Sequence, residues 1–592
     1  MKRFFLPYII VVLIFVLSFA TYNLSTHNYE EKYSVELRYE QNYSLTYSEA
    51  IAAYTELDKN YSTAKLLEYG VTETGHPLHL FVISKSKIFN PEILREKGFR
   101  ILMVNNGIHP GEPCGIDASV QLARDILAKK DGLWELMDST VLCIIPVYNI
   151  AGAHNRSPFN RANQNGPEEQ GFRANGRNLD LNRDFAPMDS RDARSFAIIT
   201  HTWKPHILID THTTNGADYQ YVMTFIGAHR QGLPPVLGDF YDQKLEPFLF
   251  ESMEKSGYEM IPYVDPMGDT PESGLQSYIS SPRYTTGYGR VFNIITYMPE
   301  AHMFKPFRDR VLATYSLIES SLVFIDENGK ELAERKCKAN EYMANQKQFV
   351  VSWSLDSTKV EQIQFKGYEA EYIPSKITGG KRLHYNRQKP FTKNIPFYRH
   401  YNPVLTIEKP DFFVIPQAWR QAIQRLAVND IKMERMIKDT LMEVDVYYIE
   451  NYETYERPYN GHYVHYNVKV REEKQKIQFF KGDYIVYTNQ PYNEYIIQML
   501  EPRANDSFFA WNFFDAVLQR KEYFSPYVFE DYAEKFLEKN PEVKKELEER
   551  REIDKEFAAN SYAQLSFIYQ RSPYFEKSFM RYPVYRGWGS RK

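Results

Sequence analysis

In the first half of the chain the hydrophobic positions follow two alternating patterns. Short continuous apolar runs at 100–105, 141–148 and 207–211 are typical of buried strands. Between them, apolar positions spaced three and four residues apart predict helices at 115–129 and 192–203. Strands that alternate with helices predict βαβ units and a largely parallel sheet, whose ligand site lies at the carboxyl ends of the strands.

The pattern changes after about residue 325. Short alternating runs predict strands, and the highly charged segment 530–558 predicts two helices divided at Asn540-Pro541. The predicted strands lie at 350–354, 362–365, 369–373, 412–416, 444–448, 463–470 and 484–487. The expected organisation is a linker at 21–44, an α/β domain at 45–325, a β-rich accessory region at 330–520 and a helical, aromatic-rich tail at 521–592.

The N-terminus has the pattern of a targeting segment. A basic flank precedes an almost unbroken apolar run at 4–20, and the small residues Ser18 and Ala20 favour cleavage as a secretory signal peptide at 1–20. The alternative is an uncleaved membrane anchor, because the run reaches the lower limit for spanning a bilayer. Both interpretations place the remaining chain outside the cytoplasm, in the periplasm, at the cell surface or secreted, and membrane contact is expected only for the uncleaved form.

Composition narrows the possible functions. The chain has 592 residues, and Lys+Arg 72 against Asp+Glu 76 leaves a net charge of −4, which argues against a nucleic-acid-binding protein. The cysteines at 114, 143 and 337 have neither a disulfide framework nor zinc-ribbon spacing. Aromatic residues reach 15%, and many tyrosines follow residue 330. We interpret them as packing groups for short strands rather than as a sugar-stacking surface.

Polar residues with metal-ligand chemistry follow two of the predicted strands. His109 and Glu112, three residues apart, come after the strand at 100–105, and His212 comes directly after the apolar residues 207–209. A catalytic zinc site needs three protein ligands and an open position, and these three side chains meet that requirement. Glu300 ends the apolar strand predicted at 294–300 and is the candidate general base. It would take a proton from the attacking water and deliver it to the leaving nitrogen.

A turn-rich loop at 171–185 separates the two metal segments. It carries several arginines with interleaved asparagines, which suit recognition of a carboxylate or an oxyanion by planar hydrogen bonds.

The ordered set His109-x-x-Glu112, Arg173, Asp180, Asn182-Arg183, His212 and Glu300, on an α/β pattern, resembles the zinc metallocarboxypeptidases. The specific resemblance is to a bacterial secreted type with a C-terminal accessory region. The resemblance covers about 45–325 and implies a mixed, largely parallel eight-stranded sheet flanked by helices, one Zn²⁺ ion, and hydrolysis of the last peptide bond of peptides or proteins with a free C-terminal carboxylate. The residues that carry it are His109, Glu112, Arg173, Asp180, Asn182, Arg183, His212 and Glu300.

The resemblance also implies a role for each residue. His109, Glu112 and His212 match the zinc ligands, and Glu300 matches the general base. Arg173 matches the residue that polarises the scissile carbonyl and stabilises the oxyanion. Asn182 and Arg183 match the pair that grips the terminal carboxylate, and Asp180 matches the carboxylate that orients the first zinc histidine.

The sequence departs from the best-known family members at several positions. Gly111 stands where many carry an arginine, and both Tyr284 and Tyr288 are candidates for the tyrosine that covers the substrate. The pair His462 and His465 is interpreted as structural, because residues three apart on a strand point to opposite faces.

Two alternative functions stay open at this stage. The same zinc chemistry could serve an amidase or deacylase acting on peptidoglycan-type amides. A catalytically inactive surface protein that binds peptides is the non-enzyme alternative, although none of the expected residues is missing.

Overall fold

The computed structural model describes residues 33–214 and 216–589. The predicted signal peptide or anchor at 1–20 lies outside the described residues, as does the first part of the linker predicted at 21–44. Within the described ranges, no helix combines the length and the apolar character that crossing a membrane requires.

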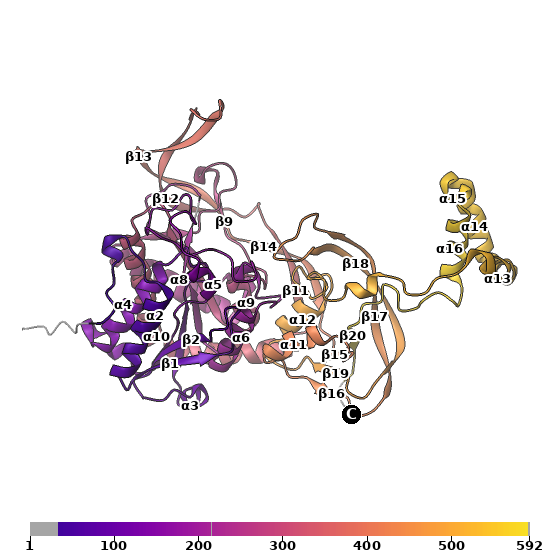
Figure 1. Ribbon diagram of the computed structural model, residues 1–592, viewed down its shortest axis with the longest axis horizontal. Helices are drawn as coiled ribbons and strands as arrows, with labels where there is room; N and C mark the ends of the chain where they lie inside the picture. The colour runs from indigo at the N-terminus through magenta and orange to yellow at the C-terminus, as the bar shows by residue number, and fades with distance from the viewer. Residues whose placement is uncertain (1–32, 215, 590–592) are drawn as a thin grey trace, which may run out of the picture. The chain divides into compact units, whose positions relative to one another are not determined.

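A mixed sheet forms the centre of the region at 45–325, which holds the expected catalytic residues and is named the catalytic region for them (Figure 1). In spatial order its strands are β1 (Ala64–Tyr69), β2 (Leu78–Ile83), β4 (Thr140–Ile145), β3 (Arg100–Asn105), β5 (Ile207–Asp210), β10 (Ile295–His302), β7 (Met223–Ile226) and β8 (Met260–Pro262). A short strand, β6 (His212–Thr214), continues from β5 and pairs with β10. The four central strands β4, β3, β5 and β10 are parallel, and antiparallel pairs flank them. The predicted eight-stranded, largely parallel sheet is confirmed.

The helices of this region follow the predicted periodicity. The predicted helices at 115–129 and 192–203 are observed as α4 (Cys114–Leu127) and α6 (Arg191–Trp203). The region also contains α2 (Tyr47–Asn60), α3 (Pro91–Glu96), α5 (Ile150–His154), α7 (Pro235–Phe240), α8 (Glu246–Lys255) and α9 (Thr285–Val291). A capping box fixes the start of α2, because the Thr46 side chain accepts from the Glu49 backbone N–H while the Glu49 carboxylate accepts from that of Thr46.

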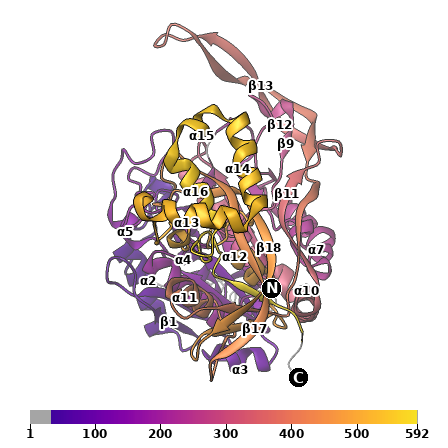
Figure 2. The ribbon, with the colours of Figure 1, turned by 90° about the vertical axis from the view of Figure 1, so that its right-hand side faces the viewer.

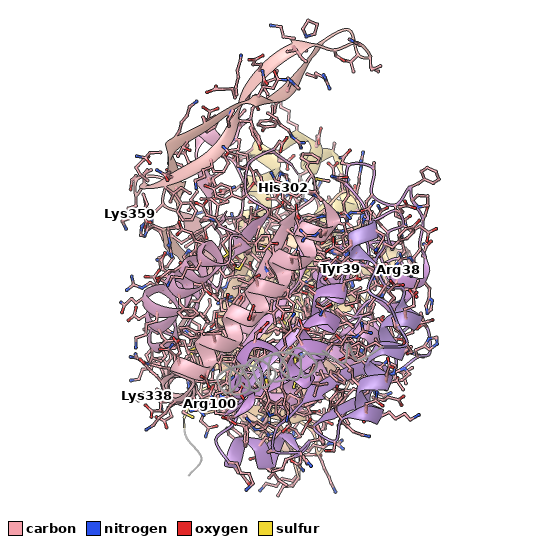
Figure 3. All side chains as sticks on the ribbon, turned by 90° about the vertical axis from the view of Figure 1, so that its left-hand side faces the viewer. Arg38, Tyr39, Arg100, His302, Lys338 and Lys359 are labelled. Carbon is pink, nitrogen blue, oxygen red and sulfur yellow. The ribbon has the colours of Figure 1, made fainter. Side chains whose placement is uncertain are left out.

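One long helix, α10 (Phe307–Asn345), follows the last sheet strand and packs against α4, α7 and α8. Figure 3 shows it crossing the catalytic region, from His302 near its first turn to Arg100 and Lys338 towards its other end. The helix is continuous through 325–330, where the sequence predicts a domain boundary. The other domain limits stay predictions.

The accessory region contains two kinds of β structure. A six-stranded sheet has the order β16 (Glu434–Arg435), β19 (Tyr484–Tyr487), β15 (Phe412–Ile415), β20 (Tyr585–Gly587), β17 (Thr440–Thr454) and β18 (His465–Phe479). Two helices, α11 (Arg420–Val428) and α12 (Asn493–Leu500), accompany it. Separately, β11 (Gln348–Leu355) pairs with β14 (Tyr401–Glu408), and β12 (Glu361–Pro374) pairs with β13 (Lys381–Tyr398).

The prediction of two short strands at 362–365 and 369–373 was wrong. Both segments belong to the single strand β12, which forms a long two-stranded ribbon with β13 (Figure 2). Residues beyond Gly367 are half-buried or exposed on both faces, so the apolar alternation that marks a strand stops there although the backbone pairing continues. At its base the ribbon pairs with β9 (Leu275–Gln276) of the catalytic region.

The catalytic and accessory regions share one hydrophobic core. A single cluster of buried side chains includes Phe196 and Phe292 of the catalytic region together with Tyr495, Phe508 and Trp511 of the accessory region. The Phe292 and Tyr495 ring centroids lie 4.8 Å apart. Much of the aromatic excess beyond residue 330 therefore serves packing, as the composition suggested.

The C-terminal helices have a core of their own. They are α13 (Pro526–Lys539), α14 (Pro541–Ile553), α15 (Lys555–Ala559) and α16 (Ser561–Arg571), drawn in yellow in Figure 1. Phe529, Leu547 and Phe567 belong to a cluster separate from the shared core. The predicted division at Asn540-Pro541 is confirmed, because proline cannot donate the backbone hydrogen bond that would continue α13. The prediction of only two helices in 530–558 was wrong, because Asp554 ends α14 and caps the start of α15.

Candidate active site

Three buried side chains from separate segments meet at the carboxyl ends of the central strands. His109 and Glu112 lie in the loop between β3 and α4, and His212 begins β6. Their ligand atoms all lie within 4.8 Å of one another. No other group of three or more metal-ligating side chains occurs among the residues that the structure describes.

The Glu112 carboxylate is fixed from two sides. Its Oε2 accepts from the Thr213 backbone N–H at 2.9 Å, and its Oε1 accepts from Arg161 Nη2 at 2.8 Å. Burial alone would raise the pKa of Glu112, but Arg161 and the two histidines outweigh burial and hold this pKa well below its usual range. The group is therefore an anionic ligand already in place for a cation.

Each histidine is held by a carboxylate on the side away from Glu112. His109 Nε2 lies 2.9 Å from Asp180 Oδ1, and His212 Nε2 lies 3.0 Å from Asp210 Oδ2. Such contacts fix the orientation of a metal-binding imidazole.

The opposite ring nitrogens face Glu112. His212 Nδ1 lies 3.1 Å from Glu112 Oε2 and His109 Nδ1 lies 3.3 Å from Oε1. His109 Nδ1 is buried and has no hydrogen-bond partner among the described residues. A shielded nitrogen that faces a carboxylate and a second imidazole fits a zinc ligand.

Asp210 was missed by sequence reasoning. Besides His212, it accepts from Asn105 Nδ2 at 2.9 Å and from Thr285 Oγ1 at 2.5 Å. Its position two residues before His212, at the end of a buried strand, is a signal that could have identified it.

Glu300 lies on β10 directly opposite His212 on β6 in the parallel register. Its side chain is nearly buried. Burial raises the pKa of Glu300 to about 8, and the charges of Glu112 and Asp210 contribute to the rise while His212 and Arg173 oppose it.

Arg173 contacts buried carboxylates of the site and is also partly exposed to solvent. Its Nε donates to Asp180 Oδ2 at 2.9 Å, its Nη1 lies 3.8 Å from Glu112 Oε1, and 41% of its side chain is exposed. A cation that is anchored on one side and open on the other can meet negative charge on a bound molecule.

Comparison with known proteins identifies the domain. Residues 51–208 match the family model described as zinc carboxypeptidase. Over these residues the chain is similar to the zinc carboxypeptidases. The matched residues contain His109, Glu112, Arg173 and the segment 180–183, whereas His212 and Glu300 lie beyond them.

Curated relatives and solved structures are similar to this chain at low sequence identity. Carboxypeptidase 2 of Trichophyton rubrum is 20% identical over 440 residues, which cover 72% of this chain and 75% of the relative. Carboxypeptidase 2 of Trichophyton equinum is 19% identical with the same coverage. A metallo-carboxypeptidase from Burkholderia cenocepacia is 16% identical, covering 47% of this chain and 68% of that one, with a TM-score of 0.35. The family match over 51–208 supports a hydrolase of the metallocarboxypeptidase class, and His109, Glu112 and His212 form a group that could hold one metal ion.

Within the matched residues, Asn182 and Arg183 occupy a short 3-10 turn capped by Asp180, whose side chain accepts from the Asn182 backbone N–H at 2.9 Å. Asn182 is held by Thr285, whose backbone N–H donates to Asn182 Oδ1 at 3.2 Å. The Arg183 guanidinium lies 4.6 Å from the centroid of the Tyr284 ring.

The two candidate tyrosines occupy different environments. Tyr284 lies beside Arg183 and precedes α9, whereas Tyr288 is fully buried within α9. The Tyr288 hydroxyl donates to Asn429 Oδ1 at 2.7 Å. Of the two, Tyr284 is therefore the one that lies beside the expected carboxylate-binding arginine.

Two further tyrosines near Glu300 were not found from the sequence. Burial raises the pKa values of Tyr263 and Tyr278, and the Glu300 charge adds to both shifts. Both tyrosines line a cavity of about 1040 Å³ that also contacts Arg399 and His400 of the accessory region.

Close packing explains the glycine at position 111. A Cβ there would lie 2.8 Å from the Gly171 carbonyl oxygen and 3.0 Å from the Arg161 side chain. Arg161, which sequence reasoning missed, is the residue that pairs with Glu112 here. Its position outside the recognised motifs gave no signal.

Among the described residues, His302, His462 and His465 belong to no group of metal-ligating side chains. His302 stacks on Tyr219 with a centroid distance of 4.0 Å. His462 Nε2 lies 2.5 Å from Asp189 Oδ2, and His465 Nε2 lies 3.0 Å from Asp515 Oδ1. The interpretation of His462 and His465 as separate structural groups agrees with these different partners.

Proposed function

We propose that the protein is a zinc-dependent carboxypeptidase that hydrolyses the C-terminal peptide bond of peptides and proteins, with Glu300 as the general base. The observation that carries the proposal is the register of β10 and β6. In this register Glu300 lies opposite His212, which supports a role for Glu300 beside the three expected metal ligands.

His109, Glu112 and His212 would hold the zinc ion. A zinc ion with three protein ligands supplies Lewis-acid polarisation of a carbonyl and lowers the pKa of a bound water towards 7. Asp180 and Asp210 keep the two imidazoles oriented for this role.

In the proposed reaction, the ionised form of Glu300, which the positive charge of a bound zinc ion would favour, takes a proton from the water that attacks the scissile carbonyl. It then delivers this proton to the leaving nitrogen, so that the carboxyl group ends each cycle ionised again. Glu300 is only 8% exposed, so its carboxyl group has little contact with bulk water.

Arg173 would stabilise the negative charge that develops on the carbonyl oxygen, because its guanidinium is anchored by Asp180 and partly open. Arg183 and Asn182 would bind the terminal carboxylate of the substrate, with Tyr284 against the guanidinium. These roles favour peptides with a free C-terminus.

An extracytoplasmic location is part of the proposal and rests on the apolar segment at 4–20. Peptides outside the cell membrane would then be the substrates.

The test is the Glu300→Gln variant, which keeps the shape of the side chain but removes its basic oxygen. Hydrolysis of an N-acylated dipeptide should fall by at least about a hundredfold, the typical contribution of a general base. Zinc content by elemental analysis should match the wild type. A Glu300→Gln variant that retains zinc and wild-type turnover would contradict the assignment.

A further inference from the structure

A hairpin turn of the accessory region reaches the catalytic loop. Tyr459 and His462 exchange backbone hydrogen bonds, with Tyr459 N donating to His462 O at 2.8 Å and His462 N donating to Tyr459 O at 3.1 Å. The two residues between them, Asn460 and Gly461, have φ values of 50° and 85°. Asn-Gly with two positive φ values is the preferred sequence of a tight two-residue hairpin turn, so local sequence dictates this shape.

The turn 459–462 contacts the segment that holds the expected carboxylate-binding residues. Asn460 Oδ1 accepts from the Asp180 backbone N–H at 2.8 Å. At the other side of the turn, His462 pairs with Asp189 across a distance of 2.5 Å. Two anchors on one short turn fix it against the loop that contains Asn182 and Arg183.

The same turn also approaches Tyr284. Burial raises the pKa of Tyr284, Arg183 lowers it, and a hydrogen bond with Tyr459 raises it further. The Arg283 guanidinium in turn lies over the Tyr459 ring, with its carbon 5.2 Å from the ring centroid. Tyr284 therefore contacts the expected carboxylate-binding Arg183 on one side and Tyr459 of the accessory turn on the other.

In the Asn460 side-chain amide, the oxygen has a hydrogen-bond partner and the nitrogen has none among the described residues. Its oxygen is taken by Asp180, which fixes the plane of the amide. Its nitrogen, Nδ2, is shielded from solvent and has no hydrogen-bond partner among the described residues. A shielded donor without an acceptor costs free energy unless a ligand supplies the acceptor.

We propose that Asn460 is a substrate-binding residue: its side-chain N–H donates to the terminal carboxylate of the bound peptide, next to Arg183. The accessory region thus completes the substrate site of the catalytic domain. The proposal rests on the proposed carboxypeptidase function, because that function supplies the carboxylate.

Two variants separate substrate binding from a purely structural role. Asn460→Asp keeps an oxygen for the Asp180 N–H but replaces the donor by a second carboxylate oxygen, which repels a carboxylate. Asn460→Gly removes both the oxygen and the nitrogen of the side-chain amide, and glycine tolerates the positive φ at this position. Asn451→Asp makes the same charge change at an exposed position of the same hairpin and is the matched control.

The measurement is calorimetric binding in the zinc-loaded Glu300→Gln background, with an N-acylated dipeptide that carries a free carboxylate and the same dipeptide as a C-terminal amide. The parent should bind the free acid more tightly. Asn460→Asp should weaken binding of the free acid by at least about tenfold, the loss expected for a hydrogen bond to a charged group. It should leave the amide unchanged, and Asn460→Gly should weaken the free acid less.

Three results would overturn the inference. If Asn460→Asp binds both peptides like the Asn451→Asp control while Asn460→Gly loses zinc or stability, Asn460 only positions Asp180. If the parent binds neither peptide, the proposed function fails and the inference fails with it. Preference of the parent for the free acid, unaltered in both Asn460 variants, overturns the inference alone.

Discussion

The catalytic sheet and the accessory sheet use strands in opposite ways. Strands β5 and β10 are buried along their whole length and β3 along nearly all of it. His109 and Glu112 follow β3, His212 follows β5, and Glu300 lies near the end of β10. Strands β17 and β18 carry exposed side chains over much of their length. The comparison shows that the expected catalytic side chains lie at or near the ends of buried strands. The partly exposed β17–β18 hairpin reaches the expected site through its turn at 459–462.

Contacts between the catalytic and accessory regions nevertheless stabilise both of them. Besides the shared apolar core, buried ion pairs join them: Arg283 with Asp506, and Arg290 with Glu494. Loss of the accessory region would expose both the core and the charges.

The largest effect is therefore expected from truncation after Asn345, the last residue of α10. The fragment keeps every expected catalytic residue but loses the partners of Phe292 and Arg290. It should be insoluble or lack cooperative unfolding, as measured by circular dichroism. A soluble, active fragment would show that the catalytic region is independent of the accessory region.

Loss of a metal ligand should abolish function without this loss of fold. His212→Ala should purify with less than about a tenth of the zinc of the wild type and without measurable hydrolysis, because a ligand and its Asp210 contact are removed together. The control His462→Ala, on the accessory turn, should keep its zinc. Equal zinc in both variants would contradict the assignment of the ligands.

Breaking the buried ion pair between the regions should be the next largest effect. Glu494→Ala leaves Arg290 buried without its partner, which costs about 3–5 kcal/mol of unfolding free energy. The double variant Arg290→Met with Glu494→Leu should recover much of that loss in urea unfolding. A single variant as stable as the wild type would show that the regions are not coupled through this pair.

Acid should weaken the contact between the regions. Burial lowers the pKa of His201 to about 4, and its Nε2 lies 3.1 Å from Asn429 Oδ1 of the accessory region. The unfolded chain binds this proton near pH 6.5 and the folded chain only near pH 4, so the unfolding free energy should fall as the pH drops through this window. In His201→Gln, urea unfolding from pH 7 to pH 4 should show a shallower fall. An unchanged pH slope would exclude His201 as a contributor.

The smallest effect is expected in the C-terminal helices, whose core is separate. Leu547→Ala should lower the stability of α13–α16 by about 2–5 kcal/mol, yet kcat/KM should stay within about twofold of the wild type. A large fall in kcat/KM would mean that these helices act on the site.

Short-range signals in the sequence accounted for much of the fold and the site. His109, Glu112 and His212 could be found because each follows a recognisable apolar strand. Asp210 was missed although it carries the same signal. Asn460 could not be found in this way, because its contact with Asp180 joins residues 280 positions apart. The length of β12 was missed because its outer half lacks apolar alternation.

The most direct test of the central claim is the pattern of products from one defined peptide, followed over time by mass spectrometry. The account predicts stepwise loss of single residues from the C-terminus of the free acid, little cleavage of the same peptide with an amidated C-terminus, and neither product with Glu300→Gln. Internal cleavage, or equal cleavage of the free and amidated peptides by the wild type, would contradict it.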